Sequence, residues 1–120
     1  MQFTESDFIA IRSVIESQLE AFQKDNAQDA FAFASPGIQE QFRTPENFIQ
    51  MVRKHYPAVY RPRSVFFENI TIIQSNITQP VLLLSPHGIP LRALYLMEKQ
   101  PDETWRINGC FLISVEAKIV

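Results

Sequence analysis

Seven side chains spread along the chain have functional groups that could take part in chemistry or ligand binding. They comprise one carboxylate, one imidazole, one guanidinium, one indole and all three phenols of the chain: Asp29, His55, Tyr56, Tyr60, Arg63, Tyr95 and Trp105. A carboxylate, imidazole or phenol can transfer protons, whereas a guanidinium can hold a carboxylate or a phosphate. Their spacing matches no catalytic motif, so we treat them as candidate cavity or ligand-binding residues and assign no catalytic residue.

The motifs that mark common catalytic and metal sites are missing from the sequence. The three glycines, Gly37, Gly88 and Gly109, are too scattered for a phosphate-binding loop, and there is no Gly-x-Ser-x-Gly turn. Neither His55 nor His87 has a Cys or another His at a spacing that would bind zinc. We therefore expect no metal and no cofactor.

Several candidates also have a purely structural interpretation. Asp29 suits the first turn of a short helix, and His55 suits a helix C-terminus, where its charged form is favoured. Trp105 can fill the core or line the mouth of a cavity, and its indole N–H needs a partner in either place. Cys110 has no neighbouring base or cation in the sequence, which predicts a buried and unreactive thiol.

The charges are unevenly distributed along the chain. Residues 1–40 hold seven acidic residues against two basic ones, whereas residues 43–63 hold five basic residues against one acidic one. The basic segment 43–63 could bind an anion or an acidic partner, or it could pair with the acidic first helix on a solvated face. The net charge of −2 and the pI of about 5.6 argue against a general nucleic-acid binder.

Length and apolar content predict one domain, residues 1–120, outside a membrane. The single cysteine cannot form an internal disulfide, and residues 1–7 contain acids and no apolar run that would suggest a signal peptide. The longest apolar run, residues 81–84, is far shorter than the roughly 20 residues that cross a membrane. We expect a cytoplasmic protein with no membrane or nucleic-acid partner.

The first half of the chain has helical periodicity. An apolar stripe predicts a helix over residues 5–24: Phe8, Ile11, Ile15, Leu19 and Phe22. A short helix over 27–34 is expected to end at Ser35-Pro36-Gly37. Thr44 and Pro45 predict the start of a third helix, which carries His55 on its apolar stripe and stops at Pro57.

The second half alternates with a period of two, as strands do. Strands are expected over residues 65–73, 81–85, 89–98 and 104–116, with a turn over 76–80. In the last strand an apolar set should form the inner wall of the sheet: Trp105, Ile107, Gly109, Phe111, Ile113 and Val115. The predicted fold is α+β, with three N-terminal helices on one face of an antiparallel sheet of four or more strands.

The opposite faces of these strands are also apolar. Leu94, Leu96 and Leu112 are expected to lie opposite Tyr95, Phe111 and Trp105. A sheet that is apolar on both faces needs a second cover. We therefore predict that the three leucines form a dimer face.

Several short segments carry a resemblance to a known superfamily. These are Phe-Ala-Ser-Pro (33–36), Thr-Pro-Glu-Asn-Phe (44–48), Met51-Val52, Tyr56 and Trp-Arg-Ile-Asn-Gly-Cys (105–110). Together they resemble the nuclear transport factor 2-like (cystatin-like α+β) superfamily, and within it a small bacterial family called domain of unknown function 4864. The resemblance implies a curved sheet wrapped on helices, a cone-shaped cavity between them, and homodimers that pack through the outer face of the sheet.

This superfamily includes enzymes and proteins without known chemistry, so the fold alone does not decide the function. Its ketosteroid-isomerase-like members use a Tyr from the first helix, where this chain has Phe8 and Phe22. Our first hypothesis is a non-catalytic module that binds a small apolar or anionic ligand, or that acts as a dimer. The alternatives are a cavity enzyme of isomerase or dehydratase type and an adaptor that uses segment 43–63.

Overall fold

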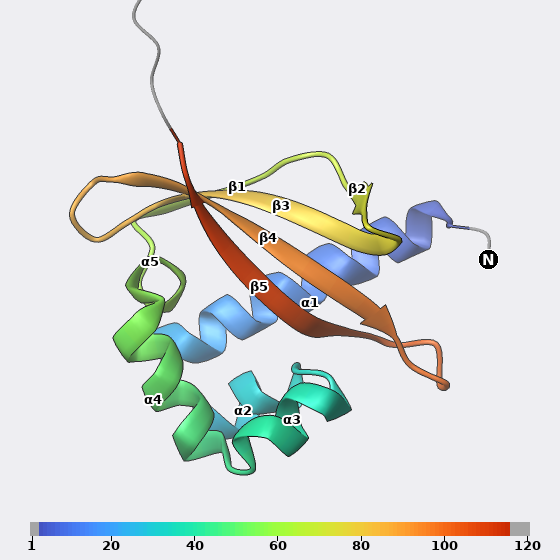
Figure 1. The fold of residues 1–120 in the computed structure, drawn as a ribbon, viewed down its shortest axis with the longest axis horizontal. Coiled ribbons are helices and arrows are strands. Elements are labelled where there is room, and N and C mark those ends of the chain that lie inside the picture. The colour runs from blue at the N-terminus through green and yellow to red at the C-terminus, as the bar shows by residue number, and fades with distance from the viewer. Residues whose placement is uncertain (1–2, 116–120) are drawn as a thin grey trace, which may run out of the picture.

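The computed structural model describes residues 3–115 and shows an α+β fold in which the helices precede the strands. The helices all lie on one side of the sheet, and the long first helix runs beneath it (Figure 1). The helices are α1 (Glu5–Gln23), α2 (Ala27–Ala32), α3 (Pro36–Phe42), α4 (Pro45–His55) and α5 (Pro57–Tyr60). The strands are β1 (Ser64–Phe67), β2 (Thr71–Ile73), β3 (Asn76–Leu84), β4 (Pro90–Lys99) and β5 (Trp105–Ser114).

Proline starts three of the helices. Pro36, Pro45 and Pro57 stand in the first turns of α3, α4 and α5, where a missing N–H costs no hydrogen bond. The second helix ends before Ser35-Pro36-Gly37 as expected, but the same segment also starts α3, a helix that was not among the three predicted. The Ser35 hydroxyl accepts from the Ile38 N–H at 3.3 Å and caps α3. Likewise, Pro57 starts α5 directly after α4, so the helical layer has five helices instead of three.

The sheet is antiparallel and has the order β1-β3-β4-β5, with β2 also paired to β3. A two-residue turn joins β2 to β3, and its residues, Gln74 and Ser75, have φ of 49° and 67°. Positive φ at both central positions suits the twist of a tight hairpin. Two predictions are corrected here: residues 65–73 form two strands, and residues 76–80 belong to β3 instead of a turn.

A β-bulge divides β5 into two halves that face opposite ways. Ile107 pairs with Met97, but Gly109 pairs with Leu96, so the register shifts by one residue between them. A shift of one residue moves every later side chain to the other face. The predicted continuous inner wall therefore fails after Ile107. Phe111 and Ile113 are 58% and 43% exposed, and the predicted strand end, Glu116, lies outside the described residues.

The inner face of the sheet packs on the helices and forms the core. Its buried strand residues are Val81, Leu83, Ala93, Tyr95, Met97, Trp105 and Ile107. From α1 the core receives Ile11, Ile15, Leu19 and Phe22. Phe8 was expected on the same stripe but is 45% exposed and stacks edge-on against Phe3.

One corner of the core joins the two ends of the described chain. The Trp105 indole N–H donates to Asp7 Oδ1 at 3.0 Å, and Lys99 Nζ lies 3.4 Å from the same oxygen. Asp7 also closes the capping box of α1 by accepting from the Thr4 backbone N–H at 2.9 Å. These contacts fasten α1 to β4 and β5. Among the described helices, none is both long enough and apolar enough to cross a membrane.

Candidate functional site

A cavity of about 340 Å³ lies between the helices and the inner face of β4 and β5. Its lining is mainly apolar: Phe22, Ala34, Ile38, Phe42, Phe48, Met51, Val52, Val59 and Ile107, with the polar residues Gln18, Gln41, Tyr56, Tyr95 and Cys110. Gly109 and Phe111 also border the cavity from the edge strand β5, although they lie on the outer side of the sheet. Ligand pockets commonly span about 300–1,000 Å³ with a mostly apolar lining, so this cavity is the candidate site.

The helical layer leaves this space because α4 packs mainly on other helices. α4 contacts α2, α3 and α5, while the inner face of β5 forms the opposite wall of the cavity. One end is closed where the chain before α3 bonds to β5. There Ser35 N–H donates to the Ile107 carbonyl at 2.8 Å, and Ile107 N–H donates to the Phe33 carbonyl at 2.9 Å. Beyond this bridge, the bulge brings Cys110 onto the inner face, opposite Tyr95.

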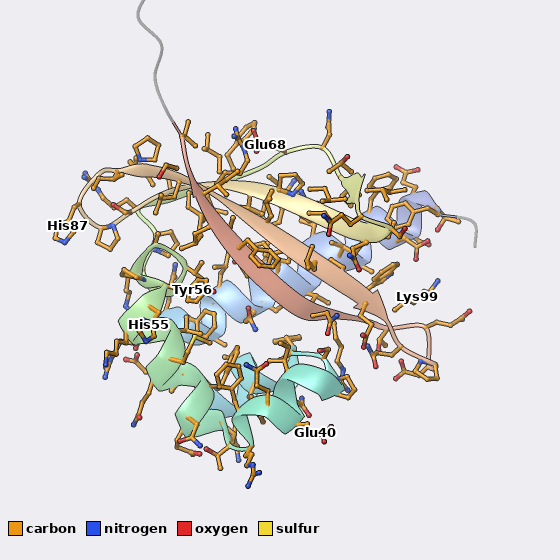
Figure 2. The ribbon with its side chains drawn as sticks, viewed as in Figure 1. Glu40, His55, Tyr56, Glu68, His87 and Lys99 are labelled. Carbon is orange, nitrogen blue, oxygen red and sulfur yellow. The ribbon has the colours of Figure 1, made fainter. Side chains whose placement is uncertain are left out.

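Two polar groups meet at the β5 wall. The Tyr56 hydroxyl donates to the Cys110 backbone carbonyl at 3.2 Å, which joins the end of α4 to β5. Figure 2 shows Tyr56 between the helical layer and β5. Burial raises the pKa of the Tyr56 phenol, and it raises the pKa of the Cys110 thiol to about 12. Both groups are therefore protonated at neutral pH.

Tyr95 is the most enclosed polar residue of the lining. It is 1% exposed, and its hydroxyl is buried without a hydrogen-bond partner in the described structure. Burial, with a smaller contribution from Cys110, raises the pKa of the phenol well above its ordinary value. Tyr95 thus brings a neutral O–H group to an apolar cavity.

The lining carries no charged side chain. Among the residues that line the cavity there is no Asp, Glu, Lys, Arg or His. Within residues 3–115, no cluster of three or more His, Cys, Asp or Glu side chains could hold a metal ion. The site can therefore offer apolar contact and neutral hydrogen bonds, and its own phenols and thiol lose protons only at alkaline pH.

The structure brings two of the seven candidates, Tyr56 and Tyr95, together in the cavity. Asp29 is exposed on α2, where its backbone N–H donates to the Asn26 cap at 3.0 Å. His55 is exposed at the end of α4, although it was expected on the apolar stripe. It lies on the helical layer away from the sheet, and His87 lies at the tip of the β3–β4 hairpin (Figure 2).

The other three candidates lie outside the cavity lining. Trp105 is buried and bonded to Asp7, as described above. Tyr60 is buried, and its hydroxyl donates to Asp25. Arg63 is exposed beside the β3–β4 turn, where its guanidinium would lie 3.3 Å from a Cβ placed on Gly88.

The basic segment 43–63 pairs in part with the acidic first section of the chain. Arg61 Nη2 lies 3.0 Å from Asp25 Oδ1, and Arg61 Nη1 donates to the Phe22 carbonyl. The same guanidinium stacks 4.2 Å from the centre of the Tyr60 ring. The Tyr60 and Arg61 hydrogen bonds hold the pKa of Asp25 below its usual value. Arg61 thus fastens α5 to the end of α1.

Gln18 is the polar lining residue of α1 that our sequence analysis did not identify. It is 3% exposed, and its side-chain amide donates to the Ala30 carbonyl at 3.0 Å. Its position was a usable signal, because it follows Ile15 by three residues and precedes Phe22 by four. Cys110 was not among the residues predicted for the inner wall of the last strand, but the bulge places it on the inner face.

The outer face of the sheet is apolar as well. Two cross-strand rows cross it: Phe66–Leu82–Arg92–Ile113 and Pro80–Leu94–Phe111. Leu96 lies beside Gly109 on this face, near Leu94. Leu112 does not belong to it, because Leu112 pairs with Ala93 and packs against the core. The bulge turns Leu112 to the inner face, whereas the sequence predicted it on the outer face.

Comparison with known proteins gives a family without an assigned activity. The chain belongs to the family described as Domain of unknown function (DUF4864), whose model matches residues 4–120. No curated protein and no solved structure matches the chain significantly.

Proposed function

We propose that this family member is a non-catalytic module that binds a small molecule in the cavity between its helices and its sheet. The observation that carries this proposal is the cavity itself, about 340 Å³ in volume, with a mostly apolar lining and a few neutral polar groups. Ligand pockets commonly combine a volume of a few hundred Å³, an apolar lining and a small number of polar groups. The size and lining of this cavity therefore suit a small molecule.

The chemistry of the lining favours binding over proton transfer. A catalytic acid or base works best with a pKa near the operating pH. The titratable groups of the lining are two phenols and a thiol, and burial moves the pKa of each away from neutrality. Asp29 and His55, the groups better suited to an isomerase or dehydratase, lie outside the lining.

Filling the cavity tests this function. Met51 lines the cavity from α4, whereas its chain neighbour Gln50 is exposed and lies outside the lining. We expect the neutral dye N-phenyl-1-naphthylamine to fluoresce on binding the wild-type protein and the Gln50→Trp control. Met51→Trp should weaken binding at least tenfold because the larger side chain takes up the same space, with circular dichroism confirming that each variant folds. A folded wild-type protein that does not bind the dye, or equal binding by Met51→Trp, would overturn the proposal.

The apolar outer face supports a second proposal, a homodimer that buries Leu94 and Leu96. Phe66, Phe111 and Ile113 are 66%, 58% and 43% exposed on this face. The charge of Arg92 is balanced within the chain, because its guanidinium forms two bonds to Glu68 at 2.6 and 3.0 Å. Apolar patches of this kind often mark protein interfaces, and two-fold dimers are the commonest assembly.

Light scattering tests the dimer. We expect a dimer at micromolar concentration that Leu96→Arg converts to a folded monomer, while Gln50→Arg on exposed helix surface leaves it intact. A wild-type monomer at high micromolar concentration would rule out this interface.

We also propose that the fold is the nuclear transport factor 2-like cone, which the one-sided helical layer and the bulged antiparallel sheet support.

A further inference from the structure

The geometry points to an uncharged ligand that presents a hydrogen-bond acceptor, such as a carbonyl or ether oxygen, to the Tyr95 hydroxyl. This inference rests on the proposed function and adds the chemical class of the ligand. Its basis is the one buried side-chain polar atom of the described residues that has no partner, which lies on a residue of the cavity wall.

A buried hydroxyl without a partner is unusual enough to need a cause. Leaving a buried polar group unpaired destabilises the folded state, and buried donors in folded proteins nearly always have a partner. Tyr95 is 1% exposed, so bulk water does not reach it. A phenylalanine here would fill almost the same space without this cost.

The cross-strand neighbours of Tyr95 are already engaged elsewhere. Gln79 pairs with Tyr95 across the β3–β4 ladder, but its amide nitrogen donates to the Glu68 and Pro80 carbonyls at 2.7 and 2.8 Å, and no hydrogen bond joins it to the Tyr95 hydroxyl. Cys110 pairs with Tyr95 on the other side, and its carbonyl accepts from Tyr56 at 3.2 Å. Tyr95 also lines the cavity, which is the place from which a ligand would supply the missing acceptor.

The uncharged lining decides the charge of the ligand. A carboxylate or phosphate in this cavity would lose its hydration and meet no cation, because no Lys, Arg or His lines the wall. The same holds for an ammonium ion, since no Asp or Glu lines the wall. The sequence left an apolar and an anionic ligand open. The uncharged lining favours the first, an uncharged and mainly apolar molecule.

Three naphthalenes that differ in one substituent test the inference. They are 2-acetylnaphthalene, which has an acceptor oxygen, 2-ethylnaphthalene, which has the same shape without it, and 2-naphthoate, which is an anion at pH 7. Each is measured by displacement of N-phenyl-1-naphthylamine from the wild-type protein, from Tyr95→Phe and from the control Tyr60→Phe. Tyr60 lies outside the cavity lining, and its hydroxyl already has a partner in Asp25.

We expect the wild-type protein to bind the ketone about fivefold more tightly than the ethyl compound, the value of one neutral hydrogen bond, and to bind the naphthoate weakest. Tyr95→Phe should abolish the preference for the ketone and leave the affinity for the ethyl compound unchanged. Tyr60→Phe should retain the preference. Equal binding of ketone and ethyl compound, a preference that survives in Tyr95→Phe, or tightest binding of the naphthoate would overturn the inference and leave the binding function standing. If neither the dye nor any naphthalene binds, the proposed function itself fails.

Discussion

Trp105 and Tyr95 are buried aromatic residues on adjacent strands, and each carries one polar group into the core. Trp105 lies before the bulge of β5, and its indole N–H has Asp7 as a partner at 3.0 Å. Tyr95 lies opposite Cys110, beyond the bulge, and its hydroxyl has no partner among the described residues. In the first region the buried polar group has its hydrogen-bond partner within the chain, whereas the second region has an unpaired hydroxyl on a residue that lines a cavity.

Whether a buried polar group has a hydrogen-bond partner within the chain therefore distinguishes a structural role from a binding role. A paired polar group in the core stabilises the fold, and its loss leaves the partner unpaired. An unpaired hydroxyl contributes little to folding and becomes useful only when a ligand supplies the acceptor. The following predictions test whether the two regions differ in this way.

The largest expected effect on stability comes from Trp105→Phe. This change removes the indole N–H that bonds to Asp7 and leaves space next to Phe3. We expect the free energy of unfolding to fall by about 2 kcal/mol, as for a buried hydrogen bond to a charged group. Urea unfolding followed by circular dichroism measures it. A loss too small to detect would mean that the corner is not the structural region we describe.

The second prediction concerns acid stability at the same corner. Hydrogen bonds from the Thr4 backbone N–H and the Trp105 indole lower the pKa of Asp7 from 3.8 to about 2. Because the folded-state pKa is the lower one, this contribution to stability is present above pH 3.8 and is lost as the pH falls towards 2. The melting temperature of the wild-type protein should therefore fall more steeply over this range than that of Asp7→Asn. Parallel profiles for the two proteins would contradict the assignment.

The third prediction compares two buried tyrosines. The Tyr60 hydroxyl donates to Asp25, so Tyr60→Phe should lower the free energy of unfolding by about 1 kcal/mol. Tyr95→Phe removes a hydroxyl without a partner, so it should leave stability unchanged or raise it by up to about 1 kcal/mol. Chemical unfolding of both variants without ligand provides the measurement. A clear loss in Tyr95→Phe would show that its hydroxyl is satisfied within the protein.

The smallest effect is expected at the bulge. A Cβ on Gly109 would lie 3.5 Å from Leu96 Cδ1, an ordinary contact, so Gly109→Ala should change stability by less than about 0.5 kcal/mol. Gly88 is the matched control, because its φ of +81° makes Gly88→Ala unfavourable by about 1 kcal/mol. Thermal unfolding compares the two. If Gly109→Ala were the more damaging change, the bulge would depend on glycine in a way that the structure does not explain.

Much of the fold follows from local signals in the sequence. Thr44 and Pro45 begin α4 as expected, and the Ile11, Ile15 and Phe22 stripe of α1 is buried. At Ser35-Pro36 the same kind of signal marks both the end of α2, which was expected, and the start of α3, which was not predicted. The α+β order with an antiparallel sheet is confirmed, since it depends on periodicity over long segments.

The candidate site was less predictable because it depends on one register shift. The alternation of β5 does not show that Phe111 turns outward and Cys110 and Leu112 turn inward. The one local signal was Gly109, because an isolated glycine in a strand often marks a bulge, but we assigned it to the inner wall. Tyr56 and Tyr95 could be named as candidates by residue type alone. Their meeting in one cavity, and the bond between Asp7 and Trp105, join residues far apart in the sequence and required the structure.

A crystal structure of the protein with 2-acetylnaphthalene tests the central claim most directly. The account predicts the naphthalene rings in the cavity among Phe48, Met51 and Ile107, with the keto oxygen about 2.7 Å from the Tyr95 hydroxyl oxygen. A cavity closed by its own side chains, or a ligand whose keto oxygen points away from Tyr95, would contradict it.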